Sequence, residues 1–494
     1  MKIAYKHLIS HIQDNPSIED ISTKLFQLGH EHEIDNGIFD IEFTPNRGDC
    51  LSIKGILRDL KVFYTIDNDF VSYDKEINHL LFDFKNYNEE ACPCISFLKL
   101  EVQDLPTTYK GKLKNYFTDL KINKNNFFTD VSNYLSYEMG QPTHCYDAEK
   151  INGRISLQEI EKEIDFETLT GNKLSLNGKN LVFIQNSEVI NLAGVMGGMS
   201  TSCSNKTKTV LVECAFFKPE LIIGKSVKYA IQSEAAHKFE RGVDPECHDV
   251  ALRRFIEIVS ENAIIKDLSF VSKKYHKKST NCIPINVDKI NTILGIKISK
   301  ADYKEYLSKL EFGIDELNIN IPSFRHDIKT QNDIAEEIAR IIGYNNIPVS
   351  QIKIPKNKSI ANDDIENKLR SFLLDNGFYE VINNPFNKKN SEESIRVDNP
   401  LDINKCFLRN NLIDSLTENL LFNERRQKDS IKLFEISDIY TFKNKIKKER
   451  KIAILASGRV GLNFEDFSTN ITRQYLSNIL KEILPEKNHK FKLI

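Results

Sequence analysis

The stretch Pro322–Pro348, PSFRHDIKTQNDIAEEIARIIGYNNIP, gathers four acidic residues around the start of one expected short helix. Asp333, Glu336 and Glu337 stand at i, i+3 and i+4, which places them close together on a helix surface, and Asp327 lies in the turn before them. Clustered carboxylates suit a hard cation, and Mg2+ is commonly held by one or two protein carboxylates and several waters. The helix macrodipole alone also favours acidic residues in a first turn, so the spacing leaves both explanations open.

The order of residues in this stretch resembles a motif in the β chain of bacterial phenylalanyl-tRNA synthetase. Three further segments resemble other parts of that family: Thr44–Asp59 (TPNRGDCLSIKGILRD) its N-terminal signature, and Asn191–Gly198 (NLAGVMGG) and Phe239–Pro245 (FERGVDP) its central domain. Motifs in the family's own order argue against coincidence, and the resemblance covers most of the chain, thinning after about Ser457. It implies a magnesium ion held by Asp327, Asp333, Glu336 and Glu337.

Length and charge limit the class of protein but do not indicate its function. A chain of 494 residues is long enough for about three or four domains that each bury a core. With a formal net charge of −2, a nucleic-acid partner has to be met by local basic patches. The run Lys443–Lys451 (KNKIKKERK) is one candidate, although its position between two apolar runs is more typical of a solvated hairpin tip.

Cysteine usage and hydropathy indicate the compartment. The 9 cysteines stand at unrelated spacings and give neither a disulfide framework nor a zinc-binding pattern. No stretch approaches the length of a transmembrane helix, and the N-terminus, MKIAYKHLISHIQ, lacks a long apolar core. We therefore expect a cytoplasmic protein with free thiols and no membrane partner.

Hydrophobic periodicity predicts a multidomain α+β protein. Residues 1–75 read as a small α/β unit, with a helix capped by Ser17 and ended by Gly29, then a short strand and a second helix. Residues 76–282 read as a mixed α/β domain, and residues 283–350 as two short helices, a strand and the acidic helix. A polar linker over 350–363 and alternating helix, loop and strand over 364–494 complete the chain.

The resemblance gives these domains an identity. Residues 76–282 correspond to an editing domain, 283–350 to a winged-helix-like module, and 364–494 to a truncated, non-catalytic, degenerate class II synthetase-like domain with an antiparallel sheet. In the family an oligonucleotide-binding barrel interrupts the N-terminal unit, yet here only a few residues separate Glu33 from Asp40, so that barrel is expected to be missing. Family members continue past the last residue into an anticodon-binding domain, so the chain is either a reduced form or a fragment.

The same resemblance separates this chain from aminoacyl-adenylate synthesis. Phe407–Leu416 (FLRNNLIDSL) and Leu433–Ile436 (LFEI) occupy the places of a class II motif, but the chemical groups of an ATP site do not line up. ATP binding and the attachment of phenylalanine are therefore assigned to a separate α subunit. The implied assembly has two α and two β chains and binds tRNA(Phe).

Polar residues in the central domain are candidates for a pocket. The segment Val131–Asp147 (VSNYLSYEMGQPTHCYD) holds Ser132, Asn133, Gln141 and His144, although a buried histidine is more often structural than catalytic. Gly194, Gly197 and Gly198 can each simply permit a turn with positive φ. Glu213 is the sharper signal, because apolar residues flank it in VLVECAFF and a buried charge needs a partner or a ligand.

In the family, the positions matching Ser132, Asn133, His144, Gly197 and Glu213 line a hydrolytic pocket that removes tyrosine wrongly attached to tRNA(Phe). A pocket built for phenylalanine rejects an extra hydroxyl only about a hundredfold, so a second site has to select that hydroxyl. Glu213 would accept a hydrogen bond from the phenol, and phenylalanine would leave this carboxylate unpaired at a cost of about 1–3 kcal/mol. His144 and Asn133 would hold the terminal ribose and a water beside the backbone at Gly197, with no general base assigned.

Three functions stay open at this point. The first is a β subunit that retains editing. We favour it because both a partner-binding fold and a pocket can still be recognised in the sequence. The second is a non-enzymatic scaffold and tRNA-binding subunit, favoured by the missing domains and by Ser132, Ala236 and Lys238, where the family usually has Thr, Ser and Arg. The third is a free-standing hydrolase or RNA-binding protein, disfavoured because Leu433–Phe442 still reads as a sound strand.

Overall fold

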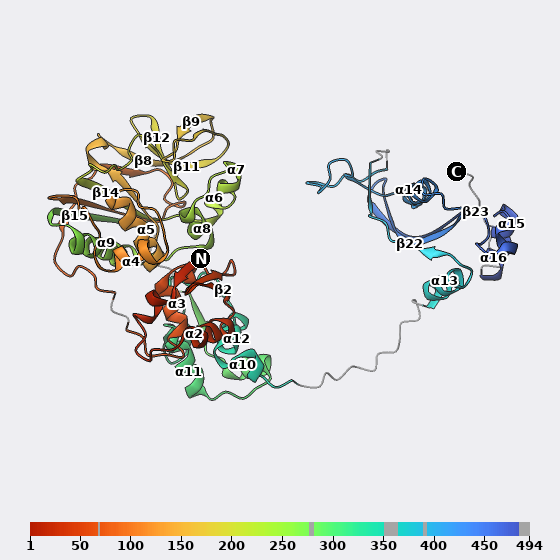
Figure 1. The fold of residues 1–494 in the computed structure, drawn as a ribbon, viewed down its shortest axis with the longest axis horizontal. Coiled ribbons are helices and arrows are strands. Elements are labelled where there is room, and N and C mark those ends of the chain that lie inside the picture. The colour runs from red at the N-terminus through yellow and green to blue at the C-terminus, as the bar shows by residue number, and fades with distance from the viewer. Residues whose placement is uncertain (68–69, 276–280, 350–363, 389–392, 484–494) are drawn as a thin grey trace. The chain divides into compact units, whose positions relative to one another are not determined.

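The computed structural model describes residues 1–67, 70–275, 281–349, 364–388 and 393–483 (Figure 1). The chain divides into two compact units, Met1–Gln351 and Ile352–Ile494. The first three predicted domains therefore lie in one unit, and the predicted linker over 350–363 falls outside the described residues.

The N-terminal unit is a three-stranded antiparallel sheet with helices, in the strand order β1-β3-β2. Its elements are β1 (Lys2–Ala4), α1 (Tyr5–Ile9), α2 (Ile18–Gln27), β2 (Glu31–Asp35), β3 (Ile38–Glu42) and α3 (Ile53–Leu60). The predicted start of α2 is confirmed, because Ser17 and Asp20 form a reciprocal capping box. The turn Asn36–Gly37 joins β2 directly to β3, so no domain is inserted between these strands.

The central domain contains two five-stranded sheets. The first sheet has the order β4-β15-β6-β14-β7, from β4 (Asn78–His79), β15 (Ile265–Lys274), β6 (Cys94–Val102), β14 (Thr209–Phe216) and β7 (Thr143–Asp147). The second sheet has the order β13-β12-β11-β8-β5, from β13 (Met196–Gly197), β12 (Glu188–Leu192), β11 (Asn180–Gln185), β8 (Ile155–Ile160) and β5 (Phe84–Asn86). A hairpin of β9 (Ile164–Glu167) and β10 (Lys173–Leu176) and the short helices α6 (Pro219–Ile222), α7 (Lys225–Lys228) and α8 (Glu234–Arg241) complete this side.

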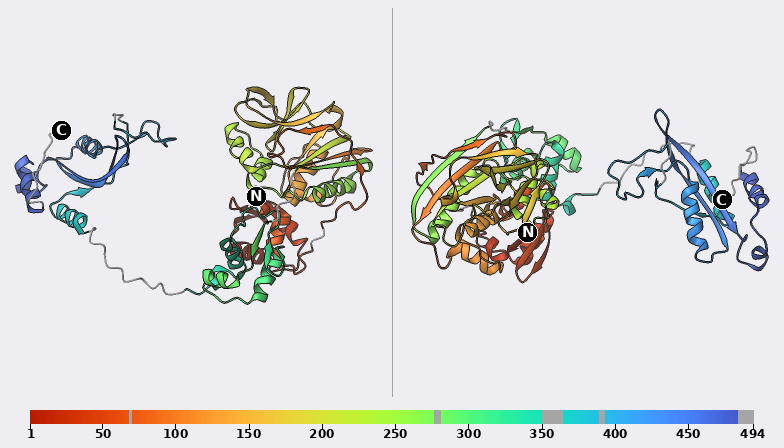
Figure 2. Two further views of the ribbon diagram at one scale, coloured as in Figure 1. Left: turned by 180° about the vertical axis from the view of Figure 1, so that it is seen from behind. Right: turned by 90° about the horizontal axis from the view of Figure 1, so that it is seen from above.

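Each face of the first sheet has its own core, because successive strand residues point to opposite faces. On β14, Val210 and Val212 pack with the N-terminal unit and with helices α4 (Gly111–Asp119), α5 (Phe127–Met139) and α9 (His248–Asn262) (Figures 1 and 2). Leu211 and Ala215 belong to the other core, which the second sheet shares. Glu213 falls between them in this alternation, so its side chain lies between the two sheets.

The segment 281–349 forms a small helical module with a three-stranded sheet, β16-β18-β17. Its elements are β16 (Cys282–Pro284), α10 (Val287–Leu294), α11 (Lys300–Lys309), β17 (Gly313–Ile314), β18 (Asn318–Asn320) and α12 (Gln331–Ile342). The two helices predicted before the acidic stretch are confirmed as α10 and α11. Their apolar faces and that of α12 form a separate core.

The second unit is built around a long hairpin of β22 (Ser430–Phe442) and β23 (Ile446–Gly458). Its other elements are α13 (Asp364–Asp375), β19 (Tyr379–Glu380), β20 (Phe386–Asn387), β21 (Phe407–Leu408), α14 (Ile413–Glu424), α15 (Phe464–Ser468) and α16 (Arg473–Ile483). The prediction of an antiparallel sheet holds for the hairpin but is wrong for β19, which pairs in parallel with β22. A parallel pair needs a crossover connection, and the segment carrying α14 supplies it. The basic run Lys443–Lys451 begins at the tip of this hairpin, as expected.

Two further observations on the described structure concern disulfide bonds and membrane-spanning helices. All of the cysteines are free thiols, most of them buried. Among the residues that the structure describes, no helix is both long enough and apolar enough to cross a membrane.

Candidate functional site

The two sheets of the central domain bring polar groups together. His144 on β7 stands opposite Glu213 on β14 in the antiparallel register, and Tyr146 follows two residues along β7. Asn191 on β12 and Gly197 on β13 pair with each other on the facing sheet. The tertiary structure therefore gathers three of the predicted site residues, His144, Gly197 and Glu213, although they come from three separate segments.

Glu213 is a buried acid with one hydrogen-bonded oxygen. Its side chain is 4% exposed, and its Oε2 accepts hydrogen bonds from Tyr146 Oη at 2.9 Å and Asn191 Nδ2 at 3.3 Å. Burial raises the pKa of Glu213 to about 8, against the opposing effect of these two hydrogen bonds. Among the described residues, no hydrogen bond reaches Oε1. The carboxyl is therefore largely protonated at neutral pH and has one oxygen available to a ligand.

His144 is held by packing and not by hydrogen bonds. Its Nε2 is buried and has no partner among the residues that the structure describes. The ring meets Tyr146 edge to face, with 4.4 Å between centroids. Burial lowers the pKa of His144 to about 4, so the imidazole is neutral at physiological pH.

Gly197 is required by its contact with this imidazole. A Cβ at Gly197 would lie 2.1 Å from Cε1 of His144, so any larger residue would have to displace the imidazole. Gly194, by contrast, has φ of +70° and fits the turn explanation that the sequence left open. Close approach, and not turn geometry, therefore accounts for Gly197.

Ser132 and Asn133 lie on α5, which covers the opposite face of the first sheet. Ser132 Oγ donates to the carbonyl oxygen of Thr143 at 2.7 Å and so ties α5 to the start of β7. Asn133 is exposed beside it. The structure thus places Ser132 as a support for the strand that carries His144 and leaves Asn133 at the surface, and their roles in a pocket stay predictions.

Some residues near the site escaped the sequence analysis or have another role. Tyr146 and Asn191 were not singled out, although the alternation of β7 places Tyr146 on the same face as His144. Gln141 is structural, because its amide donates to the carbonyl of Ala215 at 3.0 Å. Lys238 is buried, with its ammonium donating to the carbonyl of Ser136 on α5, and burial lowers its pKa to about 8.

The four acidic residues around α12 do not gather as the spacing predicted. Asp333 caps the helix in a box with Thr330. Glu337 turns inward and is 3% exposed, whereas Glu336 is exposed. The stretch therefore forms an ordinary helix start with one buried acid.

Glu337 and Asp327 bind arginine. Arg325 donates to both oxygens of Glu337 at 2.7 and 2.8 Å and to both oxygens of Asp327 at 2.9 Å. Arg340 also binds Glu337, at 2.7 Å, and the two guanidinium groups hold the pKa of Glu337 far below its usual range. Oxygens bound by guanidinium groups do not fit a magnesium ion held by this set of carboxylates, and the magnesium site stays a prediction.

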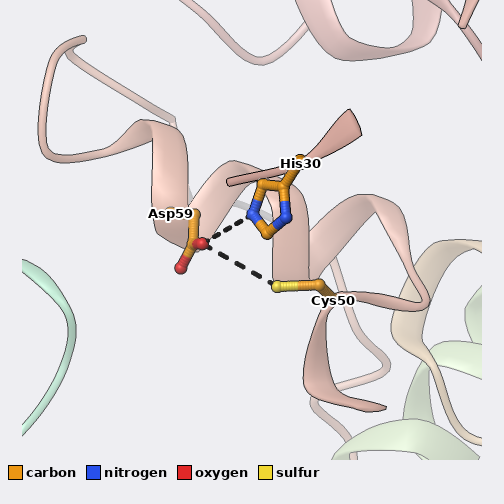
Figure 3. A group of neighbouring side chains, drawn as sticks. All are labelled: His30, Cys50 and Asp59. Carbon is orange, nitrogen blue, oxygen red and sulfur yellow. Dashed lines mark hydrogen bonds and ion pairs between the residues drawn. The ribbon is translucent and has the colours of Figure 1, made fainter. Parts of the chain in front are cut away.

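One other group of potential metal ligands lies in the N-terminal unit. His30, Cys50 and Asp59 have their ligand atoms within 4.8 Å of one another in the described structure (Figure 3). Arg47 Nη2 contacts Cys50 Sγ at 2.8 Å and Asp59 Oδ1 at 2.9 Å. Two cationic groups, Arg47 and Arg340, already neutralise Asp59, so the cluster fits an ion-pair network and not a cation site.

Three of the four recognisable sequence motifs meet beside this network. A Cβ at Gly48 would lie 2.6 Å from the carbonyl oxygen of Arg241, so the N-terminal signature touches the FERGVDP motif directly. His326 Nε2 donates to the carbonyl of Val243 at 2.8 Å, and the guanidinium of Arg58 lies 3.5 Å from the ring centroid of Phe324. These motifs therefore join three domains to one another instead of lining the pocket.

The second unit contains a comparable ion pair. Arg409 of the FLRNNLIDSL segment donates to Glu435 of the LFEI segment at 2.6 Å, and their side chains are 6% and 1% exposed. Glu435 also accepts from Asn383 Nδ2 at 2.9 Å. The class II-like arginine thus has an internal structural partner.

Comparison with known proteins gives these domains names. Family models match residues 101–263 (B3/4 domain), 283–344 (tRNA synthetase B5 domain) and 347–491 (phenylalanyl tRNA synthetase beta chain CLM domain). The phenylalanine–tRNA ligase beta subunit of Psychrobacter arcticus is 28% identical over 457 residues, covering 86% of this chain and 56% of that protein. That of Fusobacterium nucleatum is 29% identical over 480 residues, covering 90% of this chain and 59% of that protein.

A solved N-terminal fragment of the phenylalanyl-tRNA synthetase β-subunit from Pyrococcus horikoshii is also similar, with 14% identity and a TM-score of 0.39 over 69% of this chain and 99% of that chain. The three domain matches define a multidomain protein of the aminoacyl-tRNA synthetase class. The chain belongs to the phenylalanyl-tRNA synthetase β-chain family. It spans 56–59% of the length of the two bacterial relatives described above.

Proposed function

We propose that this chain is a β subunit that supports ATP-dependent attachment of phenylalanine to tRNA(Phe) by an α subunit, and that its central domain hydrolyses mischarged Tyr-tRNA(Phe). One observation carries the editing part. Between the two sheets, Nε2 of His144 is a buried polar atom without a protein partner in the described structure, and no hydrogen bond reaches Oε1 of Glu213 beside it. Buried polar atoms are normally satisfied, so an unpaired imidazole nitrogen next to an unbonded carboxyl oxygen favours a ligand with matching polar groups.

Glu213 would select the phenol. A tyrosine ring placed against Oε1 gives the carboxyl a hydrogen-bond partner, whereas a phenylalanine ring leaves it unpaired at a cost of about 1–3 kcal/mol. This cost corresponds to roughly 5-fold to 150-fold discrimination in favour of tyrosine. The preference is opposite to that of a site built for phenylalanine, as a second sieve requires.

His144 would position the reacting groups. Its pKa of about 4 makes it a weak proton acceptor at neutral pH, so we assign it to holding a water or a ribose hydroxyl at Nε2. The water oxygen attacks the ester carbonyl carbon, and the bond from that carbon to the ribose oxygen breaks. The ribose oxygen takes up a proton from the water. Positioning of an activated ester beside water accounts for much of the rate.

The second unit would support the partner subunit. Because Arg409 is bound internally by Glu435, it is not free to hold a nucleotide phosphate in this arrangement. We place ATP and its Mg2+ on the α subunit, in an assembly of two α and two β chains that binds tRNA(Phe).

A second function, a scaffold with a lapsed pocket, has one observation in its favour. The hydroxyl of Tyr146 already donates a hydrogen bond to Oε2 of Glu213, which leaves fewer hydrogen-bond acceptors for a substrate. In that case the chain completes the α subunit and its tRNA site without hydrolysing anything.

The deciding experiment measures release of tyrosine from preformed Tyr-tRNA(Phe). The chain is co-purified with its α subunit, and wild type is compared with Glu213→Ala and His144→Ala. Rapid release that falls at least tenfold in both variants supports the editing function. No release above buffer, from a complex that still charges phenylalanine, supports the scaffold, and release by the chain without an α subunit supports a free-standing hydrolase.

A further inference from the structure

We propose that Tyr146 and Asn191 are positioning residues that hold Glu213 by Oε2 and thereby leave Oε1 as the atom that distinguishes a phenol from a plain phenyl ring. This inference rests on the proposed editing function, because it concerns the substrate side chain that the same pocket selects. It concerns the orientation of the carboxyl group and not the chemistry of hydrolysis.

The directions of the hydrogen bonds carry the argument. Asn191 Nδ2 can only donate, and it reaches Tyr146 Oη at 2.9 Å and Glu213 Oε2 at 3.3 Å. The hydroxyl of Tyr146 has a single proton, and with Asn191 donating to its oxygen, that proton is directed to Oε2 at 2.9 Å. Oε2 therefore receives two hydrogens, and the proton of a neutral Glu213 belongs on Oε1.

This arrangement makes the two carboxyl oxygens unequal. No hydrogen bond reaches Oε1 from the described residues, so it can donate to a phenol oxygen when protonated and accept from the phenol when ionised. The recognising atom is the same in both protonation states. A phenyl ring offers no polar partner to it, and the mismatch stays buried.

Tyr146 also couples the two sides of the pocket. Its side chain is fully buried, and its hydroxyl donates a hydrogen bond to Glu213. Its ring and the His144 ring meet edge to face, with 4.4 Å between their centroids. The terminal torsion of a glutamate is broad and roughly two-fold, so an unheld carboxyl exchanges its two oxygens freely. Loss of the Tyr146 hydroxyl would therefore release the carboxyl while the ring that packs against His144 remains.

The competing explanation is that the hydroxyl of Tyr146 merely satisfies a buried phenol. A structural role of this kind predicts lower stability but an unchanged preference between tyrosine and phenylalanine. The chain offers a matched control, because Tyr109 Oη donates to another buried carboxylate, Asp130 Oδ2, at 2.7 Å. Tyr109→Phe removes the same group from a carboxylate on α5 that faces the other core.

The test compares wild type, Tyr146→Phe, Asn191→Leu and Tyr109→Phe in the complex with the α subunit. The measured quantity is kcat/KM for hydrolysis of Tyr-tRNA(Phe) divided by kcat/KM for Phe-tRNA(Phe). We expect this ratio to fall about tenfold in Tyr146→Phe and in Asn191→Leu and to stay within about twofold in Tyr109→Phe. Active hydrolysis with an unchanged ratio in Tyr146→Phe overturns the positioning role and leaves the editing function intact.

A binding measurement separates the two proposals. With the α active site filled by a non-hydrolysable phenylalanyl-adenylate analogue, calorimetry gives dissociation constants for free L-tyrosine and L-phenylalanine at the remaining site. If wild type does not hydrolyse but prefers L-tyrosine, and Tyr146→Phe abolishes that preference, the positioning role stands and the editing function fails. If wild type neither hydrolyses nor prefers L-tyrosine, both fail.

Discussion

Asp59 and Arg340, separated by 281 positions in the chain, form a buried ion pair with 2.9 Å between Oδ2 and Nη1. Their side chains are 1% and 6% exposed, and Asp59 also binds Arg47 and His30. One carboxylate on α3 thus binds the helix α12 of a different domain. The N-terminal unit and the module around α12 are joined by charge as well as by apolar packing.

This pair predicts a large loss of stability in Asp59→Asn. The substitution leaves Arg47 and Arg340 buried with a weakened partner, and removal of one member of a buried pair typically costs about 3–5 kcal/mol. Urea unfolding of the full chain measures the change. Asp83→Asn is the control, because the Asp83–Arg154 pair is exposed and should leave the midpoint nearly unchanged. An equally small effect in Asp59→Asn would contradict the network.

Removal of magnesium should not destabilise this chain. Because Glu337 and Asp327 are bound by guanidinium groups, the melting temperature should be the same in EDTA as in millimolar Mg2+. A site that held the ion at a hundred times its dissociation constant would instead stabilise the fold by about 2.7 kcal/mol. Glu337→Gln should lower the melting temperature equally in both buffers. A drop in EDTA that is seen in wild type and absent in Glu337→Gln would restore the magnesium assignment.

Gly197→Ala should abolish hydrolysis without unfolding the chain. The added Cβ would lie 2.1 Å from the His144 ring and displace it, whereas the backbone at this position does not need a left-handed conformation. Misplacement of a positioned group by about 1 Å costs roughly a hundredfold in rate, so release of tyrosine should fall by about that factor. Gly313→Ala is the control, since its Cβ would approach Asn320 no closer than 3.3 Å. Equal activity of the two variants would remove His144 from the site.

Glu213 predicts how stability depends on pH. Its pKa of about 8 in the folded chain lies above the ordinary value of 4.5. Between these values the folded state binds the proton and the unfolded state has lost it, so the free energy of unfolding falls as pH rises, by up to about 1.4 kcal/mol per pH unit. The contribution is fully present below pH 4.5 and lost above about 8.

Glu213→Gln should remove this dependence. The comparison is the slope of unfolding free energy against pH in wild type and variant across the range from about 5 to 8, with Glu188→Gln as a control on an exposed acid of the same domain. Parallel slopes in wild type and Glu213→Gln would mean that Glu213 stays ionised.

Arg409 should matter for stability and not for nucleotide binding. Because it donates to buried Glu435, Arg409→Ala should destabilise the unit around β22 and β23 by about 3–5 kcal/mol. Hydrogen exchange across β22 measures this loss, and a titration of the complex with ATP measures the affinity. Weaker ATP binding with unchanged exchange would assign Arg409 to a nucleotide site.

Local elements were readable because their signals lie within a few residues. The capping box of Ser17 and Asp20, the bounds of α10 and the tip of the β22–β23 hairpin all depend on neighbours in the sequence. The parallel pairing of β19 was not readable, because it depends on a crossover of many residues.

The pocket was only partly readable. Apolar neighbours marked Glu213 as buried, and resemblance to a family added His144 and Gly197. Tyr146 was missed although strand alternation places it beside His144, since alternation shows a shared face but not a hydrogen-bond partner on another strand. The reason that position 197 must be glycine, contact with an imidazole, also needed the fold.

By itself, the sequence determined local elements such as the capped helix α2, the helix α10 and the strands of the β22–β23 hairpin, and it indicated the family, because periodicity, caps and ordered motifs are local patterns. Only the tertiary structure decided which acids are free and which are paired. Helix spacing predicted that Asp333, Glu336 and Glu337 would gather, but Asp333 caps the helix, Glu337 meets Arg325 through a loop, and Asp59 meets Arg340 across the chain. A carboxylate takes its function from the charges and donors that surround it in space, and those come from residues that no local pattern connects.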